Sequence, residues 1–256
     1  MIKSLRLLKG VFYMYGWRAK IGMMIPSSNV TMEQEMWRMA PLGVSIHCSR
    51  MLGIGCNAED LRQMDNYLEQ CAEELNTIDP DAILYGCTSG SLLEGQEWER
   101  KIRQRLLLIA PNSAAVTTSG AVLAAMQAFQ DKCKNKKITI INPYVDEVAK
   151  AESEYFENNG YKVVSEYHMG FRLGRDIYSQ RPEYVYRLAK STVTKETELL
   201  FISCTNLRTI EVIDAIEQDM GIPVITSNQA SMWALLKAVD VSTKIVKNYG
   251  ALFEQD

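Results

Sequence analysis

Two cysteines, Cys87 and Cys204, are the residues in this sequence with the strongest signs of chemical function. A thiolate is a good nucleophile, and a thiol can also give or take a proton. A pair of thiols can therefore catalyse covalent and proton-transfer steps without a cofactor. Each cysteine follows a short apolar run and precedes polar side chains, in Gly86-Cys87-Thr88-Ser89 and in Ser203-Cys204-Thr205-Asn206.

The remaining cysteines have no such context. The sequence has six cysteines in all, and we interpret the other four as packing residues, because a free cysteine usually behaves as a small hydrophobic residue: Cys48, Cys56, Cys71 and Cys133. No pair has C-x-x-C or zinc-finger spacing, so no metal site is predicted. Scattered cysteines in a chain of this length are typical of a reduced, cytoplasmic protein.

An internal repeat makes Cys87 and Cys204 equivalent. The apolar runs 20–26 (KIGMMIP) and 137–143 (KITIINP) both end in proline and lie 117 residues apart. The runs that precede the two cysteines, 82–85 and 199–202, have the same separation. A third pair, 116–119 and 225–228, precedes alanine-rich segments at a separation of 109 residues. Matching segments in the same order predict two similar halves.

Each half is predicted to form a parallel α/β unit. Short apolar strands alternate with amphipathic helices such as 58–75 and 146–158, in the order strand, helix, strand, helix, strand. Further helices, 121–131 and 230–239, follow the last strand of each half. We therefore expect an α/β fold with two similar parallel-sheet halves related by a pseudo-twofold axis and the active site in the cleft between them.

We predict a boundary between the halves near residue 118. The first half is expected to span 16–118, with the C-terminal helix in 229–256 packed on it, and the second to span 119–228. Residues 1–15 are interpreted as a leader to which no structure is assigned, with Met14 as a candidate start.

Polar residues at the strand ends should meet in the cleft, because ligands of open parallel sheets bind at the carboxyl ends of the strands. A helix that begins just after Cys87 would lower the pKa of its thiol and offer N–H groups to an anion. We expect the same arrangement after Cys204. Two anion sites in one cleft suit a ligand with two carboxylates.

The composition excludes other partners. Hydrophobic residues make up 47% and charged residues 23%, and the formal net charge is -3. Nucleic acid and anionic membranes call for a clustered basic surface, so neither is predicted as a partner. No apolar run is long enough to span a bilayer. Homo-oligomers are common among soluble enzymes, which makes a homo-oligomer a candidate assembly.

Four segments together resemble the maleate cis-trans isomerases of the aspartate/glutamate racemase superfamily, which also contains arylmalonate decarboxylase. These are Pro26-Ser27-Ser28-Asn29, Gly86-Cys87-Thr88-Ser89-Gly90, Pro143-Tyr144 and Ser203-Cys204-Thr205-Asn206-Leu207-Arg208-Thr209. The resemblance covers about residues 16–239. It implies that Cys87 adds as a thiolate to an alkene carbon of maleate. Rotation about the resulting single bond and expulsion of the thiolate then give fumarate.

The resemblance also implies the remaining roles. Cys204 manages the proton at the neighbouring carbon, and no metal, flavin or nicotinamide is needed. The residues implied to hold the carboxylates are Asn29, Thr88, Ser89, Tyr144, Thr205 and Asn206. A substrate-binding asparagine of these isomerases has no counterpart in the aligned stretch 169–177. Arg172 or Arg175 is the candidate to replace it.

Other functions fit parts of the pattern. Two thiols that face one stereocentre suit a racemase of amino acids or dicarboxylates. Arylmalonate-type decarboxylases, by the same resemblance, keep only the second cysteine, whereas this chain has both. A dicarboxylate-binding sensor is the non-enzymatic alternative, and binding alone would not require the thiols.

Overall fold

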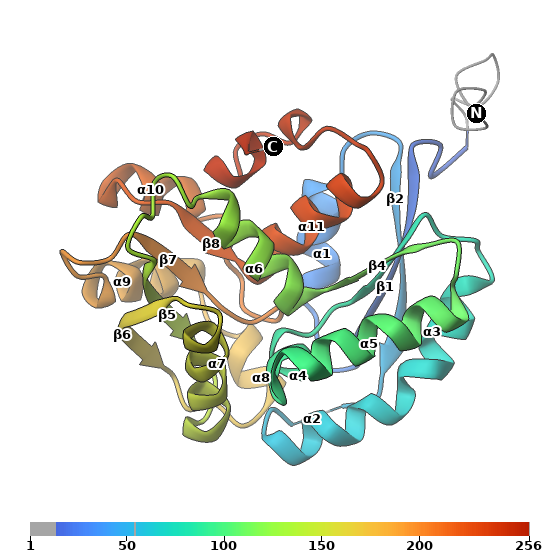
Figure 1. Cartoon of the computed structure of the whole chain (residues 1–256), viewed down its shortest axis with the longest axis horizontal. Helices are drawn as coiled ribbons and strands as arrows, with labels where there is room; N and C mark the ends of the chain where they lie inside the picture. Colours follow the sequence, from blue (N-terminus) through green and yellow to red (C-terminus); the bar gives the residue numbers. More distant parts are fainter. Residues whose placement is uncertain (1–13, 54, 256) are drawn as a thin grey trace.

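Two four-stranded parallel sheets form the framework of the computed structural model, which describes residues 14–53 and 55–255 (Figure 1). The first sheet has the order β2-β1-β3-β4 and contains β1 (Ala19–Pro26), β2 (Val44–Met51), β3 (Ala82–Tyr85) and β4 (Ala114–Thr117). The second has the order β6-β5-β7-β8 and contains β5 (Lys137–Asn142), β6 (Lys162–His168), β7 (Leu199–Ile202) and β8 (Val224–Thr226). The predicted α/β fold with two similar halves is confirmed.

The repeat is visible in single hydrogen bonds. The N–H of Gly86 donates to the carbonyl of Met24 at 2.7 Å. The N–H of Ser203 donates to the carbonyl of Ile141 at 2.8 Å, and both partners are shifted by 117 residues. The residue before each cysteine is therefore fixed to the first strand of its half in the same way.

Helices connect the strands and cover the sheets. In the first half these are α1 (Met32–Met39), α2 (Ala58–Met64), α3 (Leu68–Asn76), α4 (Thr88–Leu92), α5 (Gly95–Ile109) and α6 (Thr118–Ala128). In the second they are α7 (Asp146–Asn158), α8 (Gly174–Tyr178), α9 (Pro182–Thr192), α10 (Ile213–Met220) and α11 (Ser227–Ala238). Short 3-10 helices are η3 (Asp65–Tyr67), η4 (Thr243–Ile245) and η5 (Ala251–Glu254).

Several predicted elements have different bounds. The stretch 58–75 forms two helices, α2 and α3, separated by η3. Each half has four strands rather than three, and β6 was not predicted, because its residues are mostly half-buried or exposed and carry no apolar run. Both alanine-rich helices begin earlier than expected, at Thr118 and Ser227, since a threonine caps each of them.

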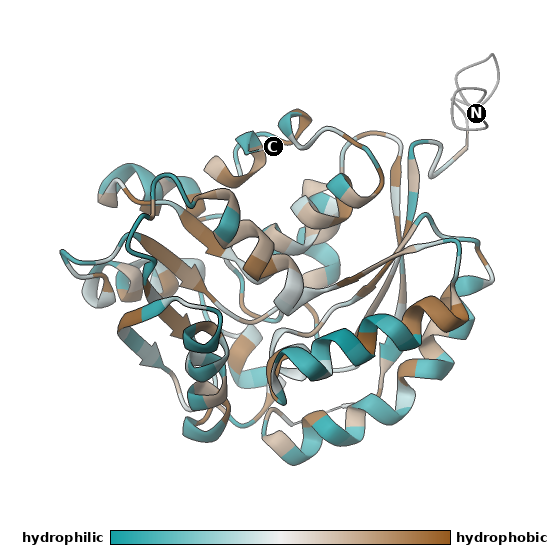
Figure 2. Ribbon diagram, viewed as in Figure 1, coloured by the Kyte–Doolittle hydropathy of each residue, from teal (hydrophilic) through white to brown (hydrophobic). Residues whose placement is uncertain are grey.

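The core lies along the central strands. Every residue of β3 and of β7 is buried, as is typical of parallel strands covered on both faces. Figure 2 shows the strands of the second sheet mainly brown, whereas α5 and α7 carry long stretches of teal. Burial of the strands therefore stabilises both sheets. Cys87 follows the end of β3, and Cys204 the end of β7, after one intervening residue.

Two helices lie between the halves. The hydroxyl of Thr117 accepts from the N–H of Gly120 at the start of α6, and Thr226 begins α11 with a reciprocal cap made with Gln229. α11 packs on α6 and α1 and also contacts strands of both sheets. The division at residue 118, with 229–256 assigned to the first half, stays a prediction. Residues 1–13 of the proposed leader lie outside the described residues.

In the part of the chain that the structure describes, no helix is both long enough and apolar enough to cross a bilayer.

Gly86 should not tolerate a side chain. A Cβ atom there would lie 2.7 Å from the carbonyl oxygen of Met24 and 2.9 Å from Cγ2 of Ile25. We expect Gly86→Ala to lower the free energy of unfolding by about 2 kcal/mol, the typical cost of overpacking a core. The midpoint of chemical denaturation measures the effect. Gly53→Ala is the control, because its Cβ would lie 3.4 Å from the flexible side chain of Met64. Equal midpoints for the two variants would refute the steric argument.

Candidate active site

A small cavity of about 40 Å³ lies between the two halves, at the carboxyl ends of β1, β3 and β7. All the residues predicted to form the site line it: Asn29, Cys87, Thr88, Ser89, Tyr144, Cys204, Thr205 and Asn206. The cavity therefore brings together side chains that are up to 177 residues apart in sequence. Its size restricts a ligand to a small molecule.

Cys87 is the N-cap of α4, which begins at Thr88, so a helix begins just after this cysteine as the sequence predicted. Its sulfur accepts from the N–H of Gly90 at 3.4 Å and lies 3.8 Å from the hydroxyl oxygen of Ser89. Burial raises the pKa of the Cys87 thiol, and the contacts with Gly90 and Ser89 oppose that rise. The predicted lowering of the pKa is therefore wrong for this state of the cavity, because desolvation outweighs the helix terminus.

Cys204 has a different backbone from Cys87. No helix follows it directly, since residues 205–212 form turns and α10 begins only at Ile213. The expected second helix terminus is therefore absent from the described residues after Cys204. The φ angle of Cys204 is 92°, which a residue with a side chain adopts only at a cost of about 1–3 kcal/mol. This left-handed conformation directs the chain into a turn instead of a helix.

Burial also raises the pKa of the Cys204 thiol, and the charges of Cys56 and Cys87 raise it further. The N–H of Asn206, 3.4 Å from the sulfur, and the hydroxyl of Tyr144 favour the thiolate and oppose this rise. The rise at Cys87 has burial as its cause, whereas at Cys204 the neighbouring thiols add to the effect of burial.

One hydroxyl links the two cysteine motifs. Ser227, the first residue of α11, accepts from the hydroxyl of Thr88 at 2.8 Å and from the N–H of Cys204 at 3.0 Å. Thr88 comes from the first half and Cys204 from the second. Ser227 therefore fixes the relative position of the two motifs and helps to compensate the unusual φ angle of Cys204.

Asn29 and Asn206 join the halves around the cavity. The Asn29 side chain accepts from the N–H groups of Thr31 and Met32, and its Nδ2 donates to the hydroxyl of Thr205 at 2.9 Å. The Asn206 side chain accepts from the N–H of Val30 at 3.0 Å and donates to the carbonyl of Gly174 at 3.2 Å. Asn29 and Asn206, both predicted to bind the substrate, thus also shape the cavity.

Glu35 on α1 fixes the segment after Cys204. Its carboxylate accepts from the N–H of Thr209 at 2.9 Å and from Nδ2 of Asn228 at 2.7 Å, and the same Nδ2 donates to the carbonyl of Thr205. Burial raises the pKa of Glu35 to about 7. This buried carboxyl group therefore attaches the Cys204 segment to the first half.

The sequence analysis missed part of the cavity wall. Cys56, interpreted as a packing residue, lines the cavity together with Gly55 and Gly174. The N–H of Cys56 donates to the carbonyl of Arg172 at 3.0 Å, and Gly55 pairs with Leu173. These two loops are equivalent in the repeat, since one follows β2 and the other follows β6, but β6 was not predicted and the two loops were therefore not matched. The glycine-rich segment around residue 55 was the available signal.

No positive side chain lies among the described residues that line the cavity, and Asp60 is the one charged residue there. Arg172 and Arg175, the candidates to replace the missing asparagine, do not line it, and the side chain of Arg175 is 71% exposed. An anionic ligand would therefore be bound by neutral N–H and O–H donors. Within the described ranges, no group of three or more His, Cys, Asp or Glu residues is arranged to hold a metal ion.

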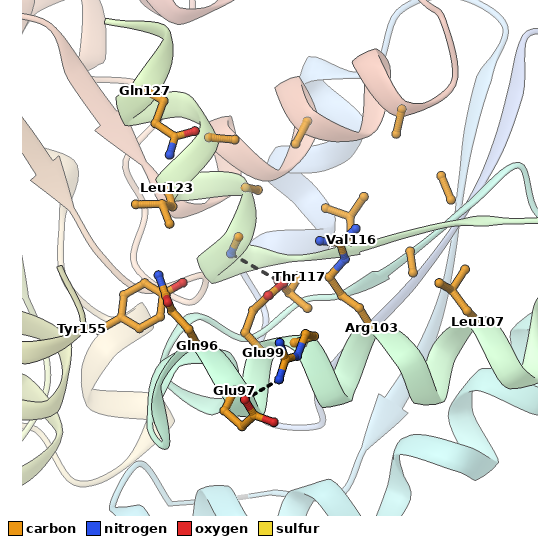
Figure 3. Close-up of a pocket in the computed structure, with 18 residues that line it drawn as sticks. Gln96, Glu97, Glu99, Arg103, Leu107, Val116, Thr117, Leu123, Gln127 and Tyr155 are labelled. Atoms are coloured by element: carbon orange, nitrogen blue, oxygen red, sulfur yellow. Dashed lines mark hydrogen bonds and ion pairs between the residues drawn. The ribbon is translucent and has the colours of Figure 1, made fainter. Parts of the chain in front are cut away.

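A larger groove of about 1000 Å³ lies elsewhere, between α5, β4 and α6 (Figure 3). None of the predicted site residues lines it. Two pairs of its polar groups bind each other, since the hydroxyl of Thr117 donates to Glu99 at 2.6 Å and Arg100 donates to Glu97. The groove has no cysteine in its wall, so the smaller cavity is the candidate active site.

The model of a known family, arylmalonate decarboxylase, matches residues 21–253. The chain belongs to the arylmalonate decarboxylase family. The match includes both cysteine motifs, both sheets and the helices α6 and α11 between them. It establishes the family for nearly all of the chain that the structure describes.

The curated relatives of this family member are named maleate isomerases rather than decarboxylases. The maleate isomerase of Geobacillus stearothermophilus is 26% identical over 246 residues, which cover 91% of this chain and 96% of the relative. The maleate isomerase of Pseudomonas putida is 26% identical over 245 residues, with the same coverage. Both alignments span almost the whole of each protein.

Solved structures show the same fold. The maleate isomerase Iso of Pseudomonas putida S16, crystallised as a cysteine-to-alanine variant with maleate, has a TM-score of 0.87 at 24% identity, covering 92% of this chain and 97% of that one. A cysteine-to-serine variant of the Nocardia farcinica maleate cis-trans isomerase, with a covalently bound succinylcysteine intermediate, has a TM-score of 0.86 at 23% identity, covering 93% and 98%. Arylmalonate decarboxylase itself, as a double variant, has a TM-score of 0.84 at 17% identity, covering 92% and 98%.

Removal of the Asn206 side chain should loosen the junction of the halves. Asn206→Ala would leave the N–H of Val30 and the carbonyl of Gly174 without this partner. We expect the free energy of unfolding to fall by about 2 kcal/mol, the cost of unpaired buried polar groups. Chemical denaturation measures it. Asn135→Ala is the control, because the Asn135 amide lies at the surface. An Asn206→Ala variant as stable as Asn135→Ala would contradict the role of Asn206 in joining the two halves.

Proposed function

We propose that this member of the arylmalonate decarboxylase family is a maleate cis-trans isomerase that works without a cofactor through a covalent adduct on Cys87. The observation that carries the proposal is the placement of two equivalent thiols, Cys87 and Cys204, in the wall of one small cavity between the halves. The names of the curated relatives and the succinylcysteine intermediate in the Nocardia farcinica enzyme support it.

The proposed reaction uses one thiol as nucleophile and the other as proton donor. The Cys87 thiolate attacks one alkene carbon of maleate, and the π electrons move toward the neighbouring carbon and its carboxylate. Cys204 delivers its proton to that carbon, which gives a succinyl adduct with a single bond. After rotation about this bond, the Cys204 thiolate takes a proton back, the C–S bond breaks and fumarate leaves.

The acidities of the thiols agree with these roles. A nucleophile must ionise, whereas a proton donor must keep its proton until the carbanion forms. Burial raises the pKa of both thiols, and at Cys204 the charges of Cys56 and Cys87 also favour the protonated form. The contacts of Cys87 with Gly90 and Ser89 also favour its thiolate.

We propose that neutral donors hold the two carboxylates: Asn29, Thr88, Ser89, Tyr144, Thr205 and Asn206. All of them line the cavity. Hydrogen bonds from neutral groups are strong in a site from which water is excluded. Their fixed positions would also favour one small dicarboxylate over larger acids.

Two other reactions are alternatives. The matched family model bears the name arylmalonate decarboxylase, which makes decarboxylation of a malonate the second candidate. Racemisation of an amino acid or dicarboxylate would use the same pair of thiols. A dicarboxylate-binding sensor would use neither thiol.

We also propose a cytoplasmic location, where the six cysteines, all unpaired in the structure, would stay reduced. A homo-oligomer is a further proposal, and neither nucleic acid nor a membrane is proposed as a partner.

Incubation of the protein with maleate should yield fumarate in the proton NMR spectrum, without added metal or cofactor. Cys87→Ser should lower the rate by at least about 1,000-fold, because the nucleophile is lost. Cys204→Ser should accumulate a succinyl adduct on Cys87, because water can still protonate the neighbouring carbon slowly, whereas a serine hydroxyl does not ionise readily and cannot take the proton back. Peptide mass spectrometry locates the adduct.

Cys71→Ser is the matched control, since Cys71 is a buried cysteine on α3 that does not line the cavity. Folded protein that forms no fumarate would refute the proposal. Carbon dioxide release from an arylmalonate, or loss of optical activity from aspartate, would select one of the alternative reactions. An adduct on Cys204 instead of Cys87 would reverse the assigned roles.

A further inference from the structure

A second buried carboxyl group, Glu152, lies at the position equivalent to Glu35. The two residues are 117 apart in sequence, the separation of the two cysteines. Each lies on the first helix of its half, Glu35 on α1 and Glu152 on α7, and both are buried. Glu35 binds backbone N–H groups and an asparagine, whereas Glu152 contacts Ser203, the residue next to Cys204.

Glu152 is connected to Tyr144 by a series of buried hydrogen bonds. The hydroxyl of Ser203 lies 2.5 Å from Oε1 of Glu152 and 3.3 Å from the hydroxyl oxygen of Tyr144. Tyr144 lines the cavity together with Cys204, and its hydroxyl lowers the pKa of the Cys204 thiol, which makes Tyr144 the last member of the series before the sulfur. The other carboxyl oxygen, Oε2, accepts from Nδ2 of Asn142 at 3.0 Å. Oε1 is therefore the oxygen that belongs to the series.

Such a series has only two consistent orientations, because each hydroxyl has one proton to donate. If Glu152 is protonated, it donates to Ser203, Ser203 donates to Tyr144, and Tyr144 donates to the sulfur. If Glu152 is ionised, every bond reverses, and the thiol of Cys204 donates to Tyr144. The first orientation favours the thiolate of Cys204, and the second favours its thiol.

We propose that Glu152 is a positioning residue that, in its protonated form, orients the hydroxyls of Ser203 and Tyr144 toward Cys204 and stabilises the Cys204 thiolate. This inference rests on the proposed role of Cys204 in proton transfer. When Cys204 gives its proton to the substrate carbon, the electron pair of the S–H bond stays on the sulfur. The Tyr144 hydroxyl then donates to that charge. When the proton returns to the sulfur, the series is restored with no net change in protons.

The first half cannot build the same series. Gly86 occupies the position equivalent to Ser203, and a Cβ atom there would lie 2.7 Å from the carbonyl oxygen of Met24. Ser27 occupies the position of Tyr144, and its hydroxyl is paired with the backbone of Gly53 instead. The hydrogen-bond series therefore exists only behind Cys204, which separates its role from that of Cys87.

The charged and titratable groups around Glu152 are few. Burial raises its pKa to about 8, the hydrogen bonds from Ser203 and Asn142 oppose this rise, and the charge of Glu166 on β6 adds to it. α4 has no charged residue, and Glu99 on α5 acts on Tyr155 rather than on Glu152. Besides Glu166, Tyr144 is a titratable group that interacts with Glu152. Glu152 is therefore mostly protonated at neutral pH and ionises as the pH rises through about 8.

The pH dependence of kcat tests the inference. In the parent protein we expect kcat to fall as the pH rises through about 8, because ionised Glu152 reverses the series. In Glu152→Gln the amide Nε2 always donates to Ser203, so this alkaline fall should disappear or shift upward by at least about one pH unit. Glu154→Gln, on the exposed face of the same helix, is the control and should keep the parent profile. An unchanged alkaline fall in Glu152→Gln would overturn the inference.

The reactivity of the thiols tests the same inference without turnover. Iodoacetamide alkylation of Cys204 and Cys87 is followed at a fixed neutral pH by peptide mass spectrometry. Ser203→Ala, which interrupts the series and removes only one hydroxyl, should slow alkylation of Cys204 about tenfold, the effect of one pKa unit. Alkylation of Cys87 in the same sample should keep its parent rate.

The outcomes separate the two proposals. Equal slowing of both cysteines would show that Ser203 acts on the cavity as a whole rather than on Cys204 and would overturn the role of Glu152. Selective slowing of Cys204 in a protein that forms no fumarate would support the hydrogen-bond series while refuting the isomerase. Selective slowing together with the shifted kcat profile would support both.

Discussion

The lack of a positive side chain among the described residues of the cavity wall is the constraint on which the site depends. In the proposed mechanism both thiols must ionise in turn, and burial raises the pKa of both. In such a place a negative charge is stabilised only by donors that are already aimed at it. The hydrogen bonds that join the halves also hold these donors in place. The same contacts therefore stabilise the junction of the halves and influence the pKa of the thiols.

The repeat provides equivalent positions, and small substitutions make them chemically different. The N–H groups of Gly86 and Ser203 bind the first strand of their halves in the same way. After Cys87 the chain enters a helix, whereas the φ angle of 92° at Cys204 directs it into a turn. One thiol thus receives its hydrogen bonds from a helix terminus, and the other from a turn N–H and a tyrosine. Under the proposed mechanism, the divergence of two equivalent thiols into nucleophile and proton carrier requires no new element of the fold.

The sequence alone was sufficient for the fold and for most of the cavity. Apolar runs at a constant separation predicted the paired strands, and the carboxyl ends of these strands identified Asn29, Tyr144 and both cysteines. It was insufficient where a strand carries no apolar run. Cys56 and Gly174 reach the cavity through the equivalent loops after β2 and β6, and β6 was not predicted. The left-handed φ angle of Cys204 leaves no signature in residue type. Desolvation of Cys87 depends on packing from both halves, so its raised pKa could not be inferred from a helix terminus.

Glu35 and Glu152 show how the same buried residue type can serve two purposes. Glu35 has backbone N–H and amide donors as its partners, and these groups cannot change direction, so it acts as a fixed link to the segment after Cys204. Glu152 has one hydroxyl partner, and a hydroxyl can either donate or accept. A carboxyl group next to a hydroxyl can transmit its protonation state, whereas one surrounded by fixed donors cannot. The hydrogen-bond partners of a buried carboxyl group therefore decide its role. Fixed N–H donors make it a structural link, whereas a hydroxyl partner lets it influence the chemistry of a neighbouring residue.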